Sequence, residues 1–415
     1  MQLGCGRSEM IFPEGFFPTE GFTVQVHPLY VRTLIFGQRE PVVLVSIEMT
    51  SLPDDETSGL RKAVAIAADA AEENVWVTVT HTFSVPHILP DMAIRTEADR
   101  AHRAALRELL MSAVCRSVEA ARRNMEEVEL TLIEGQSEVL ASRDIELPGG
   151  WWIGCGGAGP SDRTLTVLRA RSKRAVKALL IHLNVQSSVL DGTGAADGKC
   201  VSGDLAGVAC ATLEEQLPGA TAMFMIGAAG DQAPIKRAMG YAPDGDGGYE
   251  EINLREAGVA VAESLGKALA AEAKCLLQAS GAPVEGEVAV RSLTFDAPAK
   301  KMNRNLHELR PSRSCQWEPD GVKEQTIELM TVGDLAILGV KPELTYPTAR
   351  HVKEISPFAH TLVATMVNGG AKYMADRSAY ERCMYEAVNS PFAIGAAELL
   401  EEKARALFAE GRKSE

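Results

Sequence analysis

The stretch that decides the fold lies between residues 175 and 230. It reads AVKALLIHL at 175–183, DLAGVACATLEEQL at 204–217 and ATAMFMIGAAG at 220–230. The first and third segments are apolar runs of strand length, and the middle one is typical of a helix. A buried strand, a helix and a second buried strand in this order indicate an α/β protein.

Strands and helices also alternate toward the N-terminus. Two strands are expected within 22–48, joined by a polar turn at Gln38–Glu40, and an alanine-rich helix follows over 56–73. VWVTVTH at 75–81 predicts a β-branched strand, 97–126 a long helix and VELTLIEG at 128–135 another strand.

The C-terminal half continues the pattern. We expect loops over the Gly-, Pro- and Trp-rich stretch 145–163 and over 240–250, and helices over 253–279 and 391–412. Further strands are expected at EVAVRSLTF, TIELMTVG, LAILGVK and HTLVATMVNGG. There is no break in composition and no clear internal repeat, so we predict a single domain over residues 1–415.

Composition and charge limit the classes of partner. The net charge is −14 and Lys and Arg do not gather in a stripe, which argues against nucleic acid and against an anionic membrane surface. No apolar run approaches the roughly 18 residues of a membrane span, and the N-terminus lacks the features of a secretory signal. The eight cysteines include no CxxC pair, so we expect reduced, mostly buried thiols in a cytoplasmic protein.

Three glycine-rich segments resemble ligand-binding motifs without their context. GCGGAG at 154–159 leads into Pro160 and not into a helix, as a dinucleotide fingerprint would. GTGAADGKC at 192–200 has the wrong spacing for a phosphate loop, and DGDGG at 244–248 lacks the downstream glutamate of a calcium loop. None of them predicts a cofactor.

Metal-competent residues stand at the ends of three predicted strands: His81, His182 and Glu343. Sites in α/β proteins are assembled at strand ends. Two imidazoles and a carboxylate are a common ligand set for catalytic zinc, which keeps one position open for water. Each residue also has an ordinary explanation, as a structural histidine or a solvated loop glutamate, so spacing alone does not predict a metal.

Segments in the same order along nearly the whole chain carry a family resemblance. They are HPLYVR (27–32), THTFSVPH (80–87), SRD (142–144), IHLNVQSS (181–188) with VSGDLAG (201–207), GAAGDQAP (227–234), PEL (342–344) and NGGAKYMADRSAYERCMYEA (368–387). These resemble DPLYAR, THTHSGPG, NR, HPTS with GDxxG, NxGDVSP, PGE and NxYxxYxTxxEYxxQxYEA of the neutral and alkaline ceramidases. The resemblance implies a large mixed-sheet domain with flanking helices.

Carried over residue by residue, the resemblance implies a zinc ion held by four ligands: His81, His182, Glu343 and Tyr373. It also places Arg143, Tyr380 and Tyr385 around the substrate amide and its oxyanion. A guanidinium and phenols suit that role as donors to an anionic tetrahedral intermediate. The alternative for the two tyrosines is packing with a satisfied hydroxyl.

Two positions depart from the family pattern. Ala233 stands where the family has the serine of GDVSP, so no hydroxyl nucleophile is available there. Phe83 replaces the second histidine of HTH, and His87 is either its replacement or a surface-loop histidine. Attack by a zinc-activated water is therefore favoured, with His87, Asp231 or Glu343 as general base.

The sequence thus predicts a zinc-dependent hydrolase of an amide, lactam or ester bond in a small soluble substrate. Ceramide itself is not the expected substrate, because no secretory signal is seen and only about thirty residues follow the YEA segment, where family members carry a β-sandwich domain. Two alternatives stay open: an inactive, metal-stabilised small-molecule binding protein and a metal-dependent isomerase. Assembly into a homo-oligomer is also left open.

Overall fold

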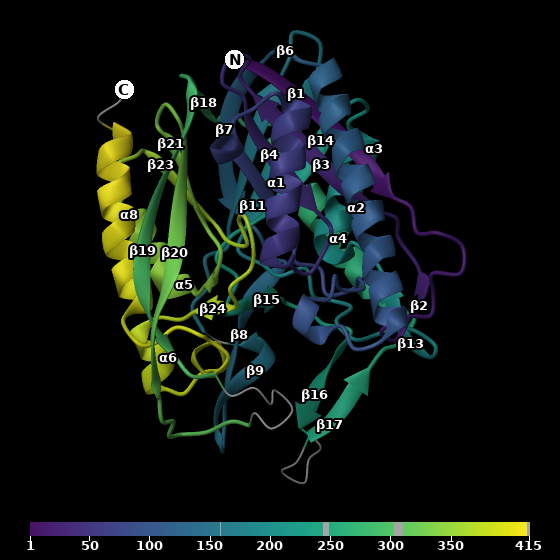
Figure 1. The fold of residues 1–415 in the computed structure, drawn as a ribbon, viewed down its shortest axis with the longest axis vertical. Helices are drawn as coiled ribbons and strands as arrows, with labels where there is room; N and C mark the ends of the chain where they lie inside the picture. Colours follow the sequence, from purple (N-terminus) through teal and green to yellow (C-terminus); the bar gives the residue numbers. More distant parts are fainter. Residues whose placement is uncertain (158, 244–248, 303–309, 413–415) are drawn as a thin grey trace.

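Three sheets with the same order of connection make up most of the fold (Figure 1). The computed structural model describes residues 1–157, 159–243, 249–302 and 310–412. In each sheet, three strands pair in antiparallel fashion, a helix crosses over, and a fourth strand pairs in parallel with the third. A further helix follows each fourth strand.

The first sheet has the order β5-β4-β3-β1-β6. Its strands are β1 (Gln2–Met10), β3 (Leu29–Phe36), β4 (Val42–Ile47), β5 (Val75–Val79) and β6 (Glu126–Glu127). Helix α1 (Asp54–Ala68) connects β4 to β5, and α2 (Glu97–Arg123) follows β5. Thr96 caps α2, because its hydroxyl accepts from Asp99 N while the Asp99 carboxylate accepts from Thr96 N.

The second sheet repeats this plan in the order β14-β11-β10-β7-β18. Its strands are β7 (Glu129–Gln136), β10 (Thr164–Arg171), β11 (Val176–Leu183), β14 (Thr221–Ile226) and β18 (Ala282–Val284). Helix α3 (Asp204–Gln216) connects β11 to β14, and α4 (Ala257–Leu276) follows β14. The strand–helix–strand prediction for residues 175–230 is therefore confirmed.

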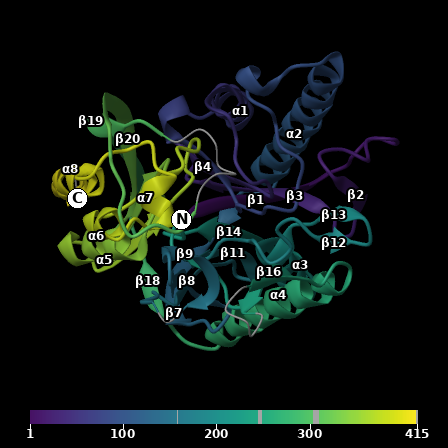
Figure 2. The same ribbon diagram turned by 90° about the horizontal axis from the view of Figure 1, so that it is seen from below.

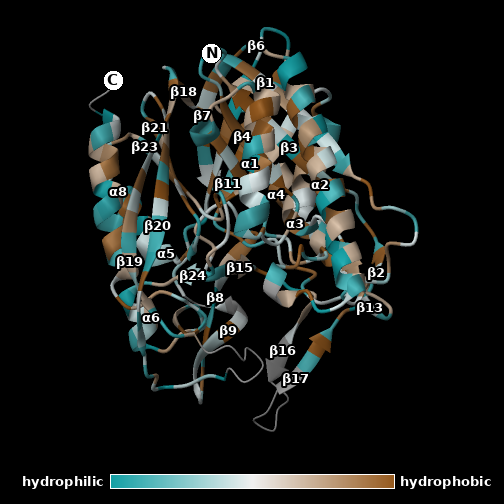
Figure 3. Ribbon diagram, viewed as in Figure 1, coloured by the Kyte–Doolittle hydropathy of each residue, from teal (hydrophilic) through white to brown (hydrophobic). Residues whose placement is uncertain are grey.

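The third sheet has the order β19-β20-β21-β23. Its strands are β19 (Val288–Lys300), β20 (Pro319–Val332), β21 (Leu335–Val340) and β23 (His360–Ala364). Helix α5 (Tyr346–Ile355) connects β21 to β23, and α8 (Ala396–Arg412) packs on this sheet with Leu400, Ala404 and Phe408 buried. Figure 3 shows the alternation of apolar and polar residues along α8.

The prediction of no internal repeat is wrong at the level of topology. The three units have the same order of strand connections, but their amino-acid sequences show no clear similarity. Strand order and crossover need only the right succession of apolar runs and helices. A search for similar sequence segments therefore misses such a repeat.

The sheets form layers between helices. Figure 2 shows α1 and α2 on one side of the first two sheets, α3 and α4 on the other, and the third sheet with α5 and α8 beside them. Successive residues of β3 face opposite layers. The Thr33 hydroxyl lies 2.6 Å from that of Ser117 on α2, whereas Arg32 Nε donates to Glu214 of α3 at 2.9 Å.

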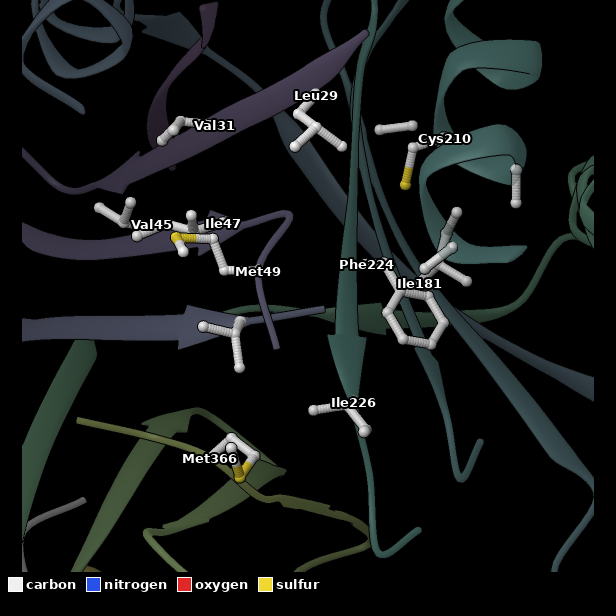
Figure 4. Packing of buried hydrophobic residues seen from close by; sticks show 14 of the residues in the cluster. Leu29, Val31, Val45, Ile47, Met49, Ile181, Cys210, Phe224, Ile226 and Met366 are labelled. Carbon is white, nitrogen blue, oxygen red and sulfur yellow. The ribbon is translucent and has the colours of Figure 1, made fainter. Parts of the chain in front are cut away.

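The hydrophobic core is continuous between the units. Figure 4 shows Val45 and Ile47 of the first sheet, Phe224 and Ile226 of the second, and Met366 from beyond β23, which all belong to one cluster of buried residues. A second cluster combines Trp76, Met223 and Ile337, one from each sheet. The structure thus confirms the α/β fold with mixed sheets and flanking helices.

Shorter elements complete the described chain. The small sheets contain β2 (Phe22–Gln25), β12 (Gly194–Ala195) and β13 (Gly198–Val201); β15 (Gln232–Pro234), β8 (Leu140–Leu147) and β9 (Gly150–Gly157); β16 (Met239–Pro243) and β17 (Tyr249–Asn253); and β22 (Glu343–Leu344) and β24 (Tyr373–Met374). The short helices are η1 (Glu72–Asn74), η2 (Asp91–Ala93), α6 (Arg377–Glu381) and α7 (Tyr385–Val388).

The loop prediction for 145–163 is wrong in its first part. This stretch forms the end of β8 and all of β9, which pair in an antiparallel hairpin. Its glycines serve close packing: a Cβ on Gly154 would lie 2.5 Å from Ile145. Likewise β16 and β17 occupy parts of 240–250, while the DGDGG segment lies outside the described residues.

The expectation of reduced cysteines is wrong for one pair. Cys315 and Cys383 form a disulfide with their Cα atoms 5.8 Å apart. The pair is separated by 68 residues, so sequence spacing gave no sign of it. Cys5, Cys200 and Cys210 are free and buried, and Cys275 is free and exposed. Among the described helices, none has the length and apolarity to cross a bilayer.

Candidate active site

Polar residues from all three sheets meet at the ends of equivalent strands. Thr50, Gln186 and Glu343 each lie three residues beyond the end of the third strand of their unit, which is β4, β11 or β21. His81 follows the fourth strand of the first unit, β5. The shared topology thus delivers one polar residue from each unit to the same place.

His81 is held in a strained position between two of these segments. Its φ of 57° is in the left-handed region that non-glycine residues seldom adopt. Its Nδ1 lies 2.5 Å from the Thr50 carbonyl, to which it donates, and its Nε2 lies 3.3 Å from Glu343 Oε2 without the alignment of a hydrogen bond. Nε2 is therefore a buried polar atom that no described residue satisfies.

The electrostatic interaction between His81 and Glu343 shifts the pKa of both groups. Burial alone lowers the pKa of His81, but the Glu343 carboxylate more than reverses this, so that the pKa is raised above its ordinary value. Burial alone raises the pKa of Glu343, and the nearby charges of His81 and Arg143 bring it below its ordinary value. Both shifts favour the charged forms, an imidazolium beside a carboxylate.

Arg143, on β8, supplies a buried positive charge. Its Nη2 and Nε donate to Glu386 Oε1 at 2.7 and 3.1 Å, and its Nη1 donates to Gln186 Oε1 at 3.0 Å. The amide of Gln186 in turn donates to Glu343 Oε2 at 2.6 Å. A chain of hydrogen bonds therefore joins Glu386 to the His81–Glu343 pair.

Two tyrosines stand over the guanidinium. Arg143 Cζ lies 5.3 Å from the ring centre of Tyr373 and 5.7 Å from that of Tyr385. Tyr373 is placed by β24, which pairs with β22 so that Tyr373 lies opposite Glu343. Asn389 Nδ2 donates to the Tyr385 hydroxyl at 3.0 Å, so this hydroxyl has its own proton left to donate.

These groups border a cavity of about 110 Å³, here called the small cavity. Its lining residues are Phe83, Arg143, Ile153, Gln186, Ser188, Asp191, Ala233, Arg237, Tyr373 and Tyr385. His81 and Glu343 are not in the lining; they contact its wall, His81 through the Phe83 ring 4.7 Å away and Glu343 through Gln186. A guanidinium and two phenols around such a space can bind a carbonyl oxygen that becomes anionic.

Comparison with solved structures places the fold. A ceramidase solved in complex with C2 matches with a TM-score of 0.75 and 14% identity, over 100% of this chain and 75% of the other. A neutral ceramidase from Pseudomonas aeruginosa matches with a TM-score of 0.72 and 16% identity, over 99% of this chain and 74% of the other. The chain has the fold of a neutral ceramidase. By sequence alone, no protein-family model and no curated protein matches it.

Within the neutral ceramidase fold, five of the residues singled out by sequence come together: His81, Arg143, Glu343, Tyr373 and Tyr385. The two departures from the ceramidase motifs, Phe83 and Ala233, both line the small cavity. An imidazole and a hydroxyl are thereby replaced by apolar groups on two of its walls.

His182 is not brought into this group. It lies within β11, opposite Thr166 and Met225, and its Nε2 donates to the Val363 carbonyl at 2.9 Å. Burial and then the charge of Lys353 lower its pKa to about 4. The side chain of a residue inside a strand projects from the face of the sheet and cannot turn past the strand end, where His81 and Glu343 lie.

Three other predicted site residues lie elsewhere. His87 is at the surface, where its Nδ1 lies 2.8 Å from Glu20 Oε2. Tyr380 is buried and donates its hydroxyl to the Phe392 carbonyl at 2.7 Å, which is the packing role held open above. Asp231 accepts from Tyr346 N at 2.9 Å and lines a different, larger cavity.

The donor set does not fit zinc. In the described part of the chain, no three His, Cys, Asp or Glu side chains are grouped so that they could hold a metal ion. Beside Glu343, where a second imidazole would be needed, the amide of Gln186 presents an N–H, which cannot ligate a metal. The hydrolysis proposed below therefore uses protein side chains and water alone.

Five lining residues of the small cavity were missed by the sequence analysis: the apolar Ile153 and the polar Gln186, Ser188, Asp191 and Arg237. For Gln186 a signal existed. Its distance from the end of its strand equals that of Glu343 from the end of β21. The resemblance of IHLNVQSS to HPTS drew attention to the histidine of that segment, whereas the offset from the strand end points to the glutamine.

Proposed function

We propose that the protein hydrolyses an amide bond, or a related lactam or ester bond, in a small molecule. The observation that carries this proposal is the buried Arg143 guanidinium with Tyr373 and Tyr385 beside it at the small cavity. Solved structures with this fold are ceramidases, which agrees with acyl-bond chemistry. A volume of about 110 Å³ suits a small acyl group and is far below that of pockets for drug-sized ligands.

In this proposal the carbonyl oxygen of the substrate points toward Arg143 and the Tyr385 hydroxyl. When water attacks the carbonyl carbon, negative charge develops on that oxygen. Donors already fixed in position stabilise this charge without reorganising. Arg143 is fixed by Glu386 and Gln186, and Tyr385 by Asn389.

In this scheme the proton of the attacking water passes through a second water molecule to His81 Nε2, because His81 lies behind Phe83 of the cavity lining. Because Nδ1–H is held by the Thr50 carbonyl, the neutral imidazole keeps its lone pair on Nε2. Glu343 stabilises the imidazolium that forms. The same proton then returns to the leaving amine or alkoxide.

The sequence predicts zinc dependence and a cytoplasmic location. The donors around His81 argue against zinc, and neither property is part of the proposed mechanism. The first is tested by the metal content of the purified protein, as set out in the Discussion. The Cys315–Cys383 disulfide argues against a cytoplasmic location, because such bonds are rare in the cytoplasm. Fractionation of the producing cells would test it.

A panel of small amides, lactams and esters assayed with and without chelator tests the proposed activity. For the substrate that is turned over fastest, Tyr385→Phe should lower kcat by about 100-fold, as the loss of one oxyanion donor does. Tyr380→Phe is the matched control and should keep its activity, because that hydroxyl serves Phe392. Absence of turnover across the panel, or equal effects of both variants, would overturn the proposal.

A further inference from the structure

A second cavity is bordered by the same strand, β8. It has a volume of about 450 Å³ and is here called the acidic cavity. Arg143 lines the small cavity, and the next residue, Asp144, lines the acidic one. The charged residues of the acidic cavity are Asp144, Glu146, Asp231, Asp376, Glu386 and Arg382.

The acidic side chains at the edge of this cavity have partners of their own. Glu146 pairs with Arg313 at 3.2 Å, and Asp376 accepts from the Thr345 hydroxyl and from Ser378 N, both at 2.9 Å. The one basic residue, Arg382, donates to Ser378 and lies 5.1 Å above the Trp151 ring. The remaining three acids are Asp144, Asp231 and Glu386. Glu386 pairs with Arg143 at 2.7 Å and Asp231 accepts from Tyr346 N, so each of these two acids has a partner at one of its oxygens.

Glu386 is the most deeply buried of these three acids. Its side chain is fully buried, at 0% exposed. Its Oε1 accepts from Arg143, while Oε2 has no hydrogen-bond partner in the described part of the chain. A buried carboxylate oxygen without a partner is costly unless a donor reaches it. Among the described residues, the Asp144 carboxylate also receives no hydrogen bond, and Asp231 receives one at Oδ1 from Tyr346 N.

Burial and the charges of neighbouring acids raise the pKa of two of these carboxyl groups. Burial, followed by the charges of Glu386 and Asp231, raises the pKa of Asp144 to about 9, although Arg143 and Arg382 act in the opposite direction. Burial, followed by the charge of Glu386, raises the pKa of Asp231 to about 7 against the hydrogen bond from Tyr346 N. Near neutral pH, protons bound to Asp144 and Asp231 thus neutralise negative charge that a bound cation would otherwise neutralise.

We propose that the acidic cavity is a binding site for a small organic ammonium ion. An ammonium group offers several N–H donors, which match the carboxylate oxygens of Asp144 and Asp231 in the lining of the cavity, with the charge of Glu386 close behind them. The apolar part of such a ligand would lie against Ile145, Pro347 and Met384. A metal ion is a poorer match, since the acids do not converge on one point within the described chain. This site does not depend on the proposed hydrolysis.

Titration calorimetry with butylammonium chloride tests the proposal, with 1-butanol as the neutral probe of nearly the same shape. Butylammonium should bind about tenfold or more tightly than butanol, since hydrogen bonds to charged groups are the stronger ones. Binding should release protons and tighten from pH 6 to pH 9, because Asp144 and Asp231 must ionise while an alkylammonium keeps its proton up to about pH 10.

Asp144→Asn should weaken butylammonium binding about tenfold and leave butanol binding unchanged. Asp320→Asn removes the same charge from an exposed position outside the cavity and should have no effect. If Asp144→Asn does not fold, the pH dependence of the unaltered protein decides. Equal affinity for both probes, tighter binding of Mg²⁺ or K⁺ than of butylammonium, or an affinity independent of pH would overturn the proposal.

Discussion

At the scale of single residues, the protonation of His81 governs the expected pH dependence. Glu343 raises the pKa of this imidazole, so it is protonated and cannot accept a proton until the pH exceeds that raised value. The rate constant kcat/KM should therefore rise with pH, with its midpoint above about 6.5, the ordinary value for histidine. A profile of kcat/KM between pH 5 and 10 checks this.

The same experiment on Glu343→Gln identifies the cause of the shift. Without the carboxylate, burial dominates and the midpoint should move to lower pH, along with a loss of activity. Glu108→Gln, on the exposed face of α2, should leave the midpoint in place. A midpoint that stays put in Glu343→Gln would exclude the pair as the titrating group.

The metal prediction depends on Gln186. The purified protein should contain zinc far below a stoichiometric amount, because His81, Glu343 and Tyr373 lack a second imidazole. Gln186→His would supply it beside Glu343 and should raise the zinc content toward one ion per chain. Metal analysis by mass spectrometry after dialysis against dilute zinc measures both.

Gln232→His is the control for this gain, because Gln232 is also buried but donates to the Pro160 carbonyl. It should bring no zinc. Stoichiometric zinc in the unaltered protein would show that the three donors suffice and would restore the zinc-dependent mechanism expected from sequence.

A stability prediction concerns the Arg143–Glu386 pair. Glu386→Gln leaves the buried guanidinium without its counter-charge and should lower the free energy of unfolding by about 3–5 kcal/mol. Glu146→Gln breaks the exposed pair with Arg313 and should cost about 1 kcal/mol or less. Urea denaturation compares them, and similar losses in both variants would contradict the assignment.

At the scale of elements, the Cys315–Cys383 disulfide fixes the segment that carries the site. Tyr385 and Glu386 are two and three residues after Cys383, so the bond anchors α7 to the chain before β20. For a separation of 68 residues, chain entropy alone predicts a stabilisation of about 4 kcal/mol. Cys383→Ser should therefore lower Tm markedly, and reductant should do the same to the unaltered protein.

Cys275→Ser provides the comparison, since Cys275 is free and exposed and its loss should leave Tm unchanged. A thiol count on the denatured, unreduced protein gives a direct check. Reactivity of all eight cysteines would show that the pair is reduced and would restore the original expectation.

At the scale of the whole molecule, the third sheet is fitted closely against the first. A Cβ on Gly339 in β21 would lie 2.9 Å from Cη2 of Trp76, which is fully buried in β5. Gly339→Val should therefore overpack this contact and cost about 1–3 kcal/mol.

Gly59→Ala is the matched control for that variant. Gly59 lies in α1 with nothing near its added methyl group, so this substitution should stabilise the protein by about 0.5–1 kcal/mol. Thermal denaturation of both variants measures the difference. Unchanged stability in Gly339→Val would mean that the sheets can move apart at little cost.

The sequence by itself determined the main alternation of strands and helices, without β1, β10 and α5, and five residues of the candidate site. Apolar runs such as 175–183 and 220–230 predict buried strands directly, because the pattern that indicates such a strand lies within a single segment of the chain. The motif resemblance located His81, Arg143, Glu343, Tyr373 and Tyr385, which the structure gathers in one place.

Only the tertiary structure decided which residues stand beside them. His182 and Gln186 are four positions apart, yet one is held inside β11 and the other lies past its end, next to Glu343. The β8–β9 hairpin, the disulfide and the acidic cavity likewise depend on segments distant in the chain. Such contacts follow from packing between layers, and the letters of any one segment do not encode them.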